Sequence, residues 1–240
     1  MLLSKEEAWY GLCIKCKKDL TNGAGEPVSR CELCGKPLIS EIDRCLPCRK
    51  NAEAEPPSYD RLISLFPYIG KYYKLLGAFK FRRSLGAGHF LAEQLIKSLD
   101  SLSLDKNEKT VLIPVPPRKG KIRKTGWDQI VSLSKLIIKN VSQETQSCVS
   151  GDTNNIDGPA YKKLQVYPCL KRQTSLTQKK LDRKDRKTNL KGRIITYRKV
   201  PKTCILFDDV ITTGSTMNAC AAALKQAGAE KVYGICLFYD

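Results

Sequence analysis

Residues 204–216 of the chain read Cys-Ile-Leu-Phe-Asp-Asp-Val-Ile-Thr-Thr-Gly-Ser-Thr. The hydrophobic run before the two aspartates is typical of a strand buried on both faces, as in the middle of a parallel sheet. After the hydroxyl-rich turn, apolar residues recur at helical spacing up to Gly228, which stands where a helix C-cap is expected. The segment therefore predicts a strand, a tight loop and a helix whose amino terminus offers free backbone N–H groups to a phosphate.

Two adjacent carboxylates, Asp208 and Asp209, stand at the end of the predicted strand. In that place they could hold sugar hydroxyls or Mg²⁺, because carboxylate oxygens accept hydrogen bonds from hydroxyls and coordinate Mg²⁺. An Asp-Asp pair followed by a Thr or Ser cap also occurs in α/β proteins that bind no ligand there. The residue types alone leave both interpretations open.

Six of the eleven cysteines fall within the first 48 residues, as three C-x-x-C pairs. Two C-x-x-C turns can direct four sulfurs at one point and form a tetrahedral, structural zinc site. Reduced thiols or a redox pair are the alternatives. We expect a small amino-terminal zinc ribbon in which Cys13 and Cys16 are doubtful ligands. The expected zinc ligands are Cys31, Cys34, Cys45 and Cys48.

Composition points to a folded protein with anionic partners. Apolar residues make up 42% of the 240 residues, which is enough for a hydrophobic core. The first residues do not have the pattern of a secretory signal, and no apolar run approaches the ~20 residues of a membrane span. We therefore expect a cytoplasmic protein without membrane insertion. The formal net charge of +18 favours phosphorylated metabolites or nucleic acid as partners, although solubility alone also explains it.

Residues 53–58, rich in proline and glutamate, indicate a linker. They separate an expected zinc-binding knuckle module, residues 1–52, from an expected α/β domain, residues 59–240. In this domain strand-like and helix-like patterns alternate, which favours a parallel sheet flanked by helices. The expected strands cover residues 63–69, 111–117 and 232–238, and the expected helices cover residues 72–80, 90–99 and 127–139.

Two basic segments accompany the predicted site. Residues 118–126 contain five basic residues and two glycines directly after a predicted strand, where open α/β sheets bind ligands. Residues 171–193 contain ten Lys or Arg residues and precede the Asp208 strand. The first segment suits an anion-binding loop and the second a flexible flap over a polyphosphate. For both, a solvated charged surface is the alternative.

Taken together, these motifs resemble the ComF/ComFC family of phosphoribosyltransferase-like proteins associated with natural competence. Residues 208–216 look like the phosphoribosyl-diphosphate (PRPP) signature shared by type I phosphoribosyltransferases. Elements that single out the family are the cysteine knuckle, Lys80-Phe81, Pro114-Val115-Pro116, Gly126 to Gln129, and Gln178-x-x-Leu181-x₄-Arg186-x-x-Asn189.

The chain departs from the family pattern in two places. Residues 125–129 read Thr-Gly-Trp-Asp-Gln where the family usually has Arg-Gly-Phe-Asn-Gln, so the arginine is missing unless Arg123 or Lys124 substitutes. Many members carry four C-x-x-C pairs and this chain has three, of which Cys31/Cys34 and Cys45/Cys48 match the second knuckle.

The resemblance implies a type I phosphoribosyltransferase-like open parallel sheet that binds PRPP with Mg²⁺. Asp208 and Asp209 would be the catalytic-site carboxylates that hold the ribose hydroxyls. The 5′-phosphate would lie against Thr212, Thr213, Gly214, Ser215 and Thr216. The diphosphate loop would include Pro116, Arg118, Lys119 and Arg123, and the flap Gln178, Arg186 and Asn189.

The function implied is transfer of the phosphoribosyl group to an unknown, nucleobase-like acceptor, linked to DNA uptake. Two other classes stay open: a single-stranded-DNA-binding accessory protein, and a regulator that senses PRPP without turning it over. Some purine-specific relatives have an acid where this chain has Thr212, which argues weakly against that class of acceptor. We expect the single histidine, His89, to be structural, because no acidic or nucleophilic motif surrounds it.

Overall fold

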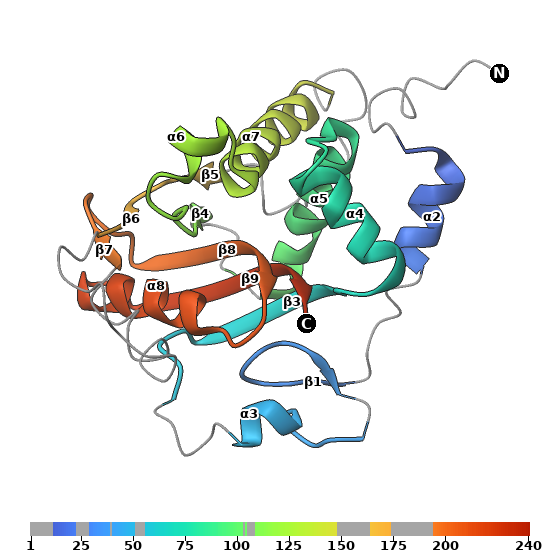
Figure 1. Ribbon diagram of the computed structural model, residues 1–240. Helices are drawn as coiled ribbons and strands as arrows, with labels where there is room; N and C mark the ends of the chain where they lie inside the picture. Colours follow the sequence, from blue (N-terminus) through green and yellow to red (C-terminus); the bar gives the residue numbers. More distant parts are fainter. Residues whose placement is uncertain are drawn as a thin grey trace, which may run out of the picture.

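A five-stranded parallel sheet lies at the centre of the computed structural model (Figure 1). The structure describes residues 12–22, 29–38, 40–50, 56–102, 104, 109–147, 164–173 and 194–240. No helix within these ranges is both long and apolar enough to span a lipid bilayer.

The strand order in the sheet is β3-β9-β8-β4-β5, and every neighbouring pair is parallel. The strands are β3 (Arg61–Pro67), β4 (Val111–Pro114), β5 (Gln165–Val166), β8 (Thr203–Ile211) and β9 (Lys231–Tyr239). β8 lies between β9 and β4, with Asp208 paired with Cys236 of β9. The hydrophobic run before Asp208 is thus a central strand, as its lack of polar alternation predicts.

Helices cover both faces of the sheet (Figure 1). One face packs against α4 (Gly70–Lys80), α5 (Leu85–Ser98) and α7 (Gln129–Ser147), and the other against α8 (Ser215–Gln226). Two buried hydrophobic clusters result, one on each side of the sheet. The α/β fold with a flanked parallel sheet agrees with the phosphoribosyltransferase-like architecture expected from sequence.

Several short elements complete the described chain. They are α2 (Ile14–Asn22), β1 (Ser29–Arg30), β2 (Pro37–Leu38), α3 (Leu46–Lys50), the 3₁₀ turn Leu99–Leu102, α6 (Lys121–Thr125), β6 (Leu170–Arg172) and β7 (Ile194–Thr196). β1 pairs with β2 and β6 with β7, both antiparallel.

Some boundaries differ from the sequence-based expectations. α5 begins five residues earlier than expected, because Ser84 caps it: the Ser84 Oγ accepts a hydrogen bond from the Ala87 backbone N–H. The basic loop 118–126 contains the short helix α6, which lies between two glycines with left-handed backbone, Gly120 and Gly126. α7 continues to Ser147, eight residues beyond the expected end of this helix at residue 139.

The cysteine knuckle covers the face of β3 beside α8. Gly35 lies so close to this strand that a Cβ atom would be 2.3 Å from the Leu62 carbonyl oxygen. The Arg30 guanidinium donates to the carbonyl oxygens of Gly35 (2.9 Å) and Ser64 (2.6 Å), and the Ser64 hydroxyl donates to the Cys34 carbonyl (2.8 Å). The knuckle therefore covers β3 where a doubly wound sheet normally has a helix.

Candidate functional site

The two signature carboxylates lie at the carboxyl end of β8 and face opposite sides of the sheet. Successive side chains of a strand alternate between the two faces, so neighbouring aspartates leave the backbone on opposite sides. Asp208 lines a pocket with the first turn of α8, whereas Asp209 contacts residues of α4 and α7. The adjacent acids thus occupy two different environments.

Asp209 is held by partners from three elements. Its Oδ2 accepts a hydrogen bond from Gln129 Nε2 (2.8 Å) and lies 3.4 Å from Lys80 Nζ. Its Oδ1 accepts from the Val210 backbone N–H (3.0 Å). Only 7% of the residue is exposed, so these contacts supply the pairing that a buried carboxylate needs. Its orientation is therefore fixed by α4, α7 and its own strand.

The contacts of Asp209 continue into the basic loop. The Lys121 ammonium donates to Gln129 Oε1 and to Asp128 Oδ2 (2.7 Å). Asp128 Oδ1 in turn accepts from the backbone N–H groups of Ile130 and Val131, in the first turn of α7. Lys80, Lys121 and Gln129 are not among the site residues predicted from the sequence, although the family resemblance includes Lys80 and Gln129.

Replacement of Gln129 by leucine is expected to lower the free energy of unfolding by about 1–3 kcal/mol, since it removes a hydrogen bond to a buried carboxylate. Urea denaturation measures this effect. The matched control is Gln226→Leu, which changes an exposed glutamine of α8 and should shift the unfolding free energy by about 0.5 kcal/mol or less. Equal effects of the two substitutions would show that the Gln129 amide does not hold Asp209.

A small polar pocket lies between Asp208 and the amino terminus of α8. Its volume is about 60 Å³, and residues 210–217 and Cys236 complete its lining. Gly214 stands at the N-cap with φ +71° and gives α8 no side-chain cap. The hydroxyls of Thr213 and Ser215 lie 2.8 Å apart at its rim. A helix terminus with free N–H groups and neighbouring hydroxyls can bind a small anion such as a phosphate.

The pKa of Asp208 is raised well above its usual value, by burial first and by the neighbouring charge of Asp209 second. Two groups act in the opposite direction: the Asp209 backbone N–H, which donates to Asp208 Oδ1 (2.9 Å), and the Arg172 guanidinium. Arg172 comes from β6 and also donates to the Pro116 carbonyl (3.0 Å). It thus links β6 to the loop after β4. The sequence-based expectation of a flexible flap over residues 171–193 is therefore wrong for Arg172, which is part of a strand.

The structure brings the predicted diphosphate loop to the same sheet edge as Asp208. Pro116 is buried after β4, the neighbour of β8, whereas Arg118, Lys119 and Arg123 are exposed. A guanidinium also lies beside the position of the missing family arginine, since Arg83 donates to the Thr125 carbonyl (2.9 Å). The flap residues Gln178, Arg186 and Asn189 lie outside the described residues.

His89 lies away from this pocket lining, inside the helical layer. It is buried in α5, and its Nδ1 is 2.9 Å from Asn140 Oδ1 of α7. This contact between two packed helices agrees with the structural role expected for the histidine.

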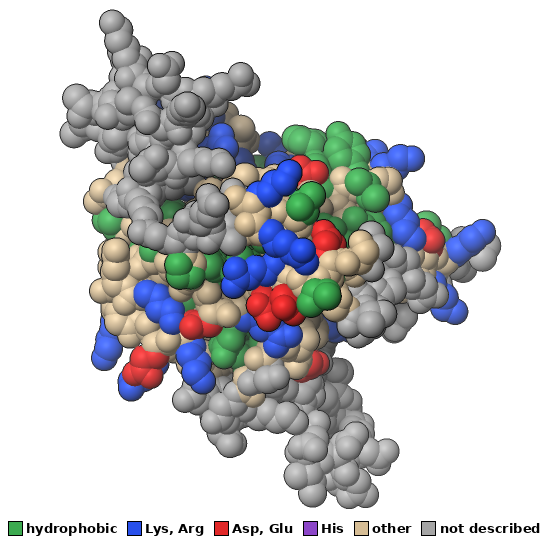
Figure 2. All heavy atoms as spheres, turned by 90° about the horizontal axis from the view of Figure 1, so that it is seen from below, with side chains coloured by type: hydrophobic (Ala, Val, Ile, Leu, Met, Phe, Trp, Pro, Cys, Tyr) green, Lys and Arg blue, Asp and Glu red, His purple; other side chains and the backbone are tan. Residues whose placement is uncertain are grey.

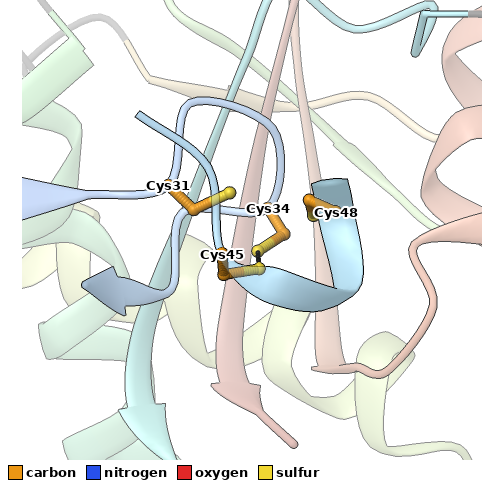
Figure 3. Close-up of side chains that lie close together, drawn as sticks. All are labelled: Cys31, Cys34, Cys45 and Cys48. Carbon is orange, nitrogen blue, oxygen red and sulfur yellow. Dashed lines mark hydrogen bonds between the residues drawn. The ribbon is translucent and has the colours of Figure 1, made fainter. Parts of the chain in front are cut away.

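The four predicted zinc ligands converge, as Figure 3 shows. Their sulfur atoms all lie within 4.8 Å of one another, with those of Cys34 and Cys45 separated by 3.5 Å. In an ideal tetrahedral site with Zn–S bonds of about 2.3 Å, the sulfurs are about 3.8 Å apart. The donor set and its dimensions therefore fit a structural zinc ion.

The protonation behaviour of these thiols also suits a metal site. Burial raises the pKa of Cys31, but backbone N–H groups that donate to its sulfur outweigh this and leave the pKa at about 7. Burial raises the pKa of Cys34 and, to about 12, that of Cys48. A metal ion replaces the protons of such thiols on binding, which relieves the cost of burying them close together.

The remaining C-x-x-C pair is not part of this cluster. Cys13 and Cys16 are both exposed at the start of α2, where the Cys16 backbone N–H lies 3.4 Å from the Cys13 sulfur. Among the described residues, only the four-cysteine group forms a metal-sized cluster of three or more such ligands.

Comparison with known proteins gives relatives over nearly the whole chain, although no protein-family profile matches it. Competence protein F of Haemophilus influenzae is 28% identical over 236 residues, covering 92% of this chain and 87% of the relative. The DNA utilization protein YhgH of Salmonella typhimurium is 24% identical over 233 residues, covering 95% of this chain and 90% of the relative.

A shorter similarity concerns a different class of protein. Ribose-phosphate pyrophosphokinase 2 of Enterococcus faecalis is 54% identical over 35 residues, which cover 15% of this chain and 11% of the relative. The two full-length relatives, the flanked parallel sheet and the four-cysteine cluster together support the resemblance of the chain to the ComF family.

Proposed function

We propose that the chain binds PRPP at the carboxyl edge of the sheet. The observation that carries the proposal is the polar pocket between Asp208 and the uncapped amino terminus of α8. Its N–H groups and hydroxyls suit the 5′-phosphate, and the adjacent carboxylates suit the ribose hydroxyls. The local similarity to ribose-phosphate pyrophosphokinase supports the same ligand class.

The exposed cations after β4 would face the diphosphate of this ligand. Mg²⁺ fits here as an ion carried largely by substrate phosphates, because it keeps several waters and needs few protein ligands. When bound, it would neutralise the diphosphate as that group leaves. Asp209, held by Lys80 and Gln129, would keep its carboxylate fixed next to the sugar while charge develops at the anomeric carbon.

The reaction we propose is transfer of the phosphoribosyl group to a nucleobase-like acceptor in the cytoplasm. The C1–O bond to diphosphate breaks, a bond from C1 to an acceptor nitrogen forms, and the acceptor loses a proton. The names of the two full-length relatives link this family to competence and DNA utilization. We infer that the activity serves the handling of imported DNA.

Titration calorimetry with PRPP and Mg²⁺ tests the binding step, and diphosphate release in the presence of individual nucleobases tests the transfer. Saturable binding that requires Mg²⁺ is the expected result. Saturable binding without diphosphate release for any base would favour a PRPP sensor. No binding at millimolar PRPP would contradict the proposal.

A nucleic-acid-binding function is the second candidate, because the net charge is +18 and relatives are named for DNA utilization. In the face drawn in Figure 2, basic side chains are scattered among acidic and apolar ones and form no continuous patch among the described atoms. Single-stranded DNA that competes with PRPP would indicate that a nucleotide end occupies the same pocket.

A further inference from the structure

A second and larger pocket lies at the opposite edge of the sheet from the carboxylates. Its volume is about 440 Å³, within the range of small-molecule sites. Its lining includes the first residues of three strands, namely Val111 of β4, Gln165 of β5 and Thr203 of β8. At about 3.3 Å per residue, β8 places this pocket about 20 Å from Asp209. It is therefore separate from the proposed PRPP site.

The lining combines an apolar wall with cations. Val111, Val200 and Pro201 are partly or fully buried and form the apolar part, beside the ring of Tyr167. The cations are Lys109, Lys199 and Lys202, all of them exposed. An apolar floor with an aromatic ring suits a flat ring system, and ammonium groups at the rim suit its phosphate.

The charges of the three lysines are not equivalent. Lys202 forms a 2.7 Å ion pair with Glu230. In the part of the chain that the structure describes, no carboxylate forms an ion pair with Lys109 or Lys199. A further cation stands next to the pocket, since the Arg198 guanidinium lies 5.7 Å from the centre of the Tyr167 ring. Glu230 thus balances Lys202, whereas no described carboxylate balances the charges of Lys109 and Lys199.

We propose that this amino-edge pocket binds a nucleotide, with the base against Tyr167 and the apolar wall and the phosphate against Lys109 and Lys199. The nucleotide can be free or one unit of a single strand, since both present the same base and phosphate. This proposal does not depend on PRPP binding at the other edge, because no residue is shared between the two pockets.

Adenosine 5′-monophosphate (AMP), titrated into the isotope-labelled full chain, provides the test by amide chemical shifts. We expect saturable shifts at residues 109–111, 165–167 and 199–203. The double substitution Lys109→Gln/Lys199→Gln should weaken the affinity reported by these amides by about tenfold or more. The control Lys74→Gln/Lys135→Gln removes two exposed lysines from α4 and α7 and should change it by less than about twofold.

A second pair of variants tests the aromatic contact. Tyr167→Leu should reduce the preference for AMP over ribose 5-phosphate, whereas Tyr197→Leu, which changes an exposed ring outside the lining, should not. Shifts confined to residues 212–216, or pocket shifts that persist unchanged in Lys109→Gln/Lys199→Gln, would overturn the proposal. So would equal affinity for AMP and ribose 5-phosphate.

The source of the nucleotide follows from a third titration. A short oligothymidylate that moves the same amides, with affinity that falls steeply with salt, identifies the ligand as one unit of a single strand. AMP binding without an oligonucleotide effect identifies a free nucleotide. Either result supports the pocket as a nucleotide site.

Discussion

Cys34→Ser is expected to remove the zinc ion and to destabilise the whole protein. Cys34 is 8% exposed, and its sulfur belongs to the four-cysteine cluster and lies 3.5 Å from the Cys45 sulfur. Its carbonyl also accepts the hydrogen bond from Ser64 of β3, so the metal site and the sheet share this residue. Loss of a structural metal belongs to the large effects, about 4 kcal/mol or more.

The expected measurements are metal content and thermal unfolding. The unsubstituted chain should contain about one zinc ion and the Cys34→Ser chain almost none. The melting temperature should fall by about 8–16 °C for a protein of this size. Cys13→Ser is the matched control, because Cys13 is an exposed cysteine outside the cluster. Complete metal loss in Cys13→Ser, or retained zinc in Cys34→Ser, would contradict the assignment.

The double substitution Asp208→Asn/Asp209→Asn is expected to abolish measurable PRPP binding. Asp209 is buried and Asp208 half-buried, and both carboxylates accept hydrogen bonds, so the loss of each should cost about 1.5–3 kcal/mol of binding free energy. Asp209→Asn alone also removes the ion pair with Lys80, and should weaken affinity about 10- to 150-fold. Calorimetry with PRPP and Mg²⁺ measures the change.

Asp100→Asn is the control for this experiment, since it neutralises an exposed carboxylate in the 3₁₀ turn after α5. It should leave the affinity within about twofold. Unchanged affinity in Asp208→Asn/Asp209→Asn would remove the basis of the proposed function, provided that urea unfolding confirms a folded protein. The proposal of a nucleotide site at the amino edge would be unaffected by that outcome, because the two pockets share no residue.

The features predicted best from the sequence are those that depend on residues close together in the chain. The run before Asp208 is long and apolar, so its central place in a parallel sheet could be predicted. The cysteine spacing likewise predicted which four sulfurs converge. By contrast, β5, β6 and β7 have only two or three residues each, too few for a periodic signal.

Contacts in the site between residues that are distant in sequence could not be predicted from the sequence in the same way. Lys80, Gln129 and Asp209 are far apart in sequence and meet only because α4 and α7 pack on the same face of the sheet. Asp208 and Asp209 look equivalent in sequence, yet alternation along the strand gives them different partners. No sequence motif marks the pocket at the amino edge of the sheet, because its lining comes from the starts of three separate strands.

The strand order has a consequence for how the chain reaches this fold. β9, residues 231–239, lies between β3 and β8, so the sheet cannot be completed until that segment has left the ribosome. The four cysteines, in contrast, lie within residues 31–48 and can meet through local chain closure, which is fast. Metal capture can therefore precede assembly of the sheet. The preformed knuckle then packs on β3 once this strand has paired in the sheet. We expect the slow kinetic phase of refolding to follow pairing of β3 with β9 rather than zinc uptake.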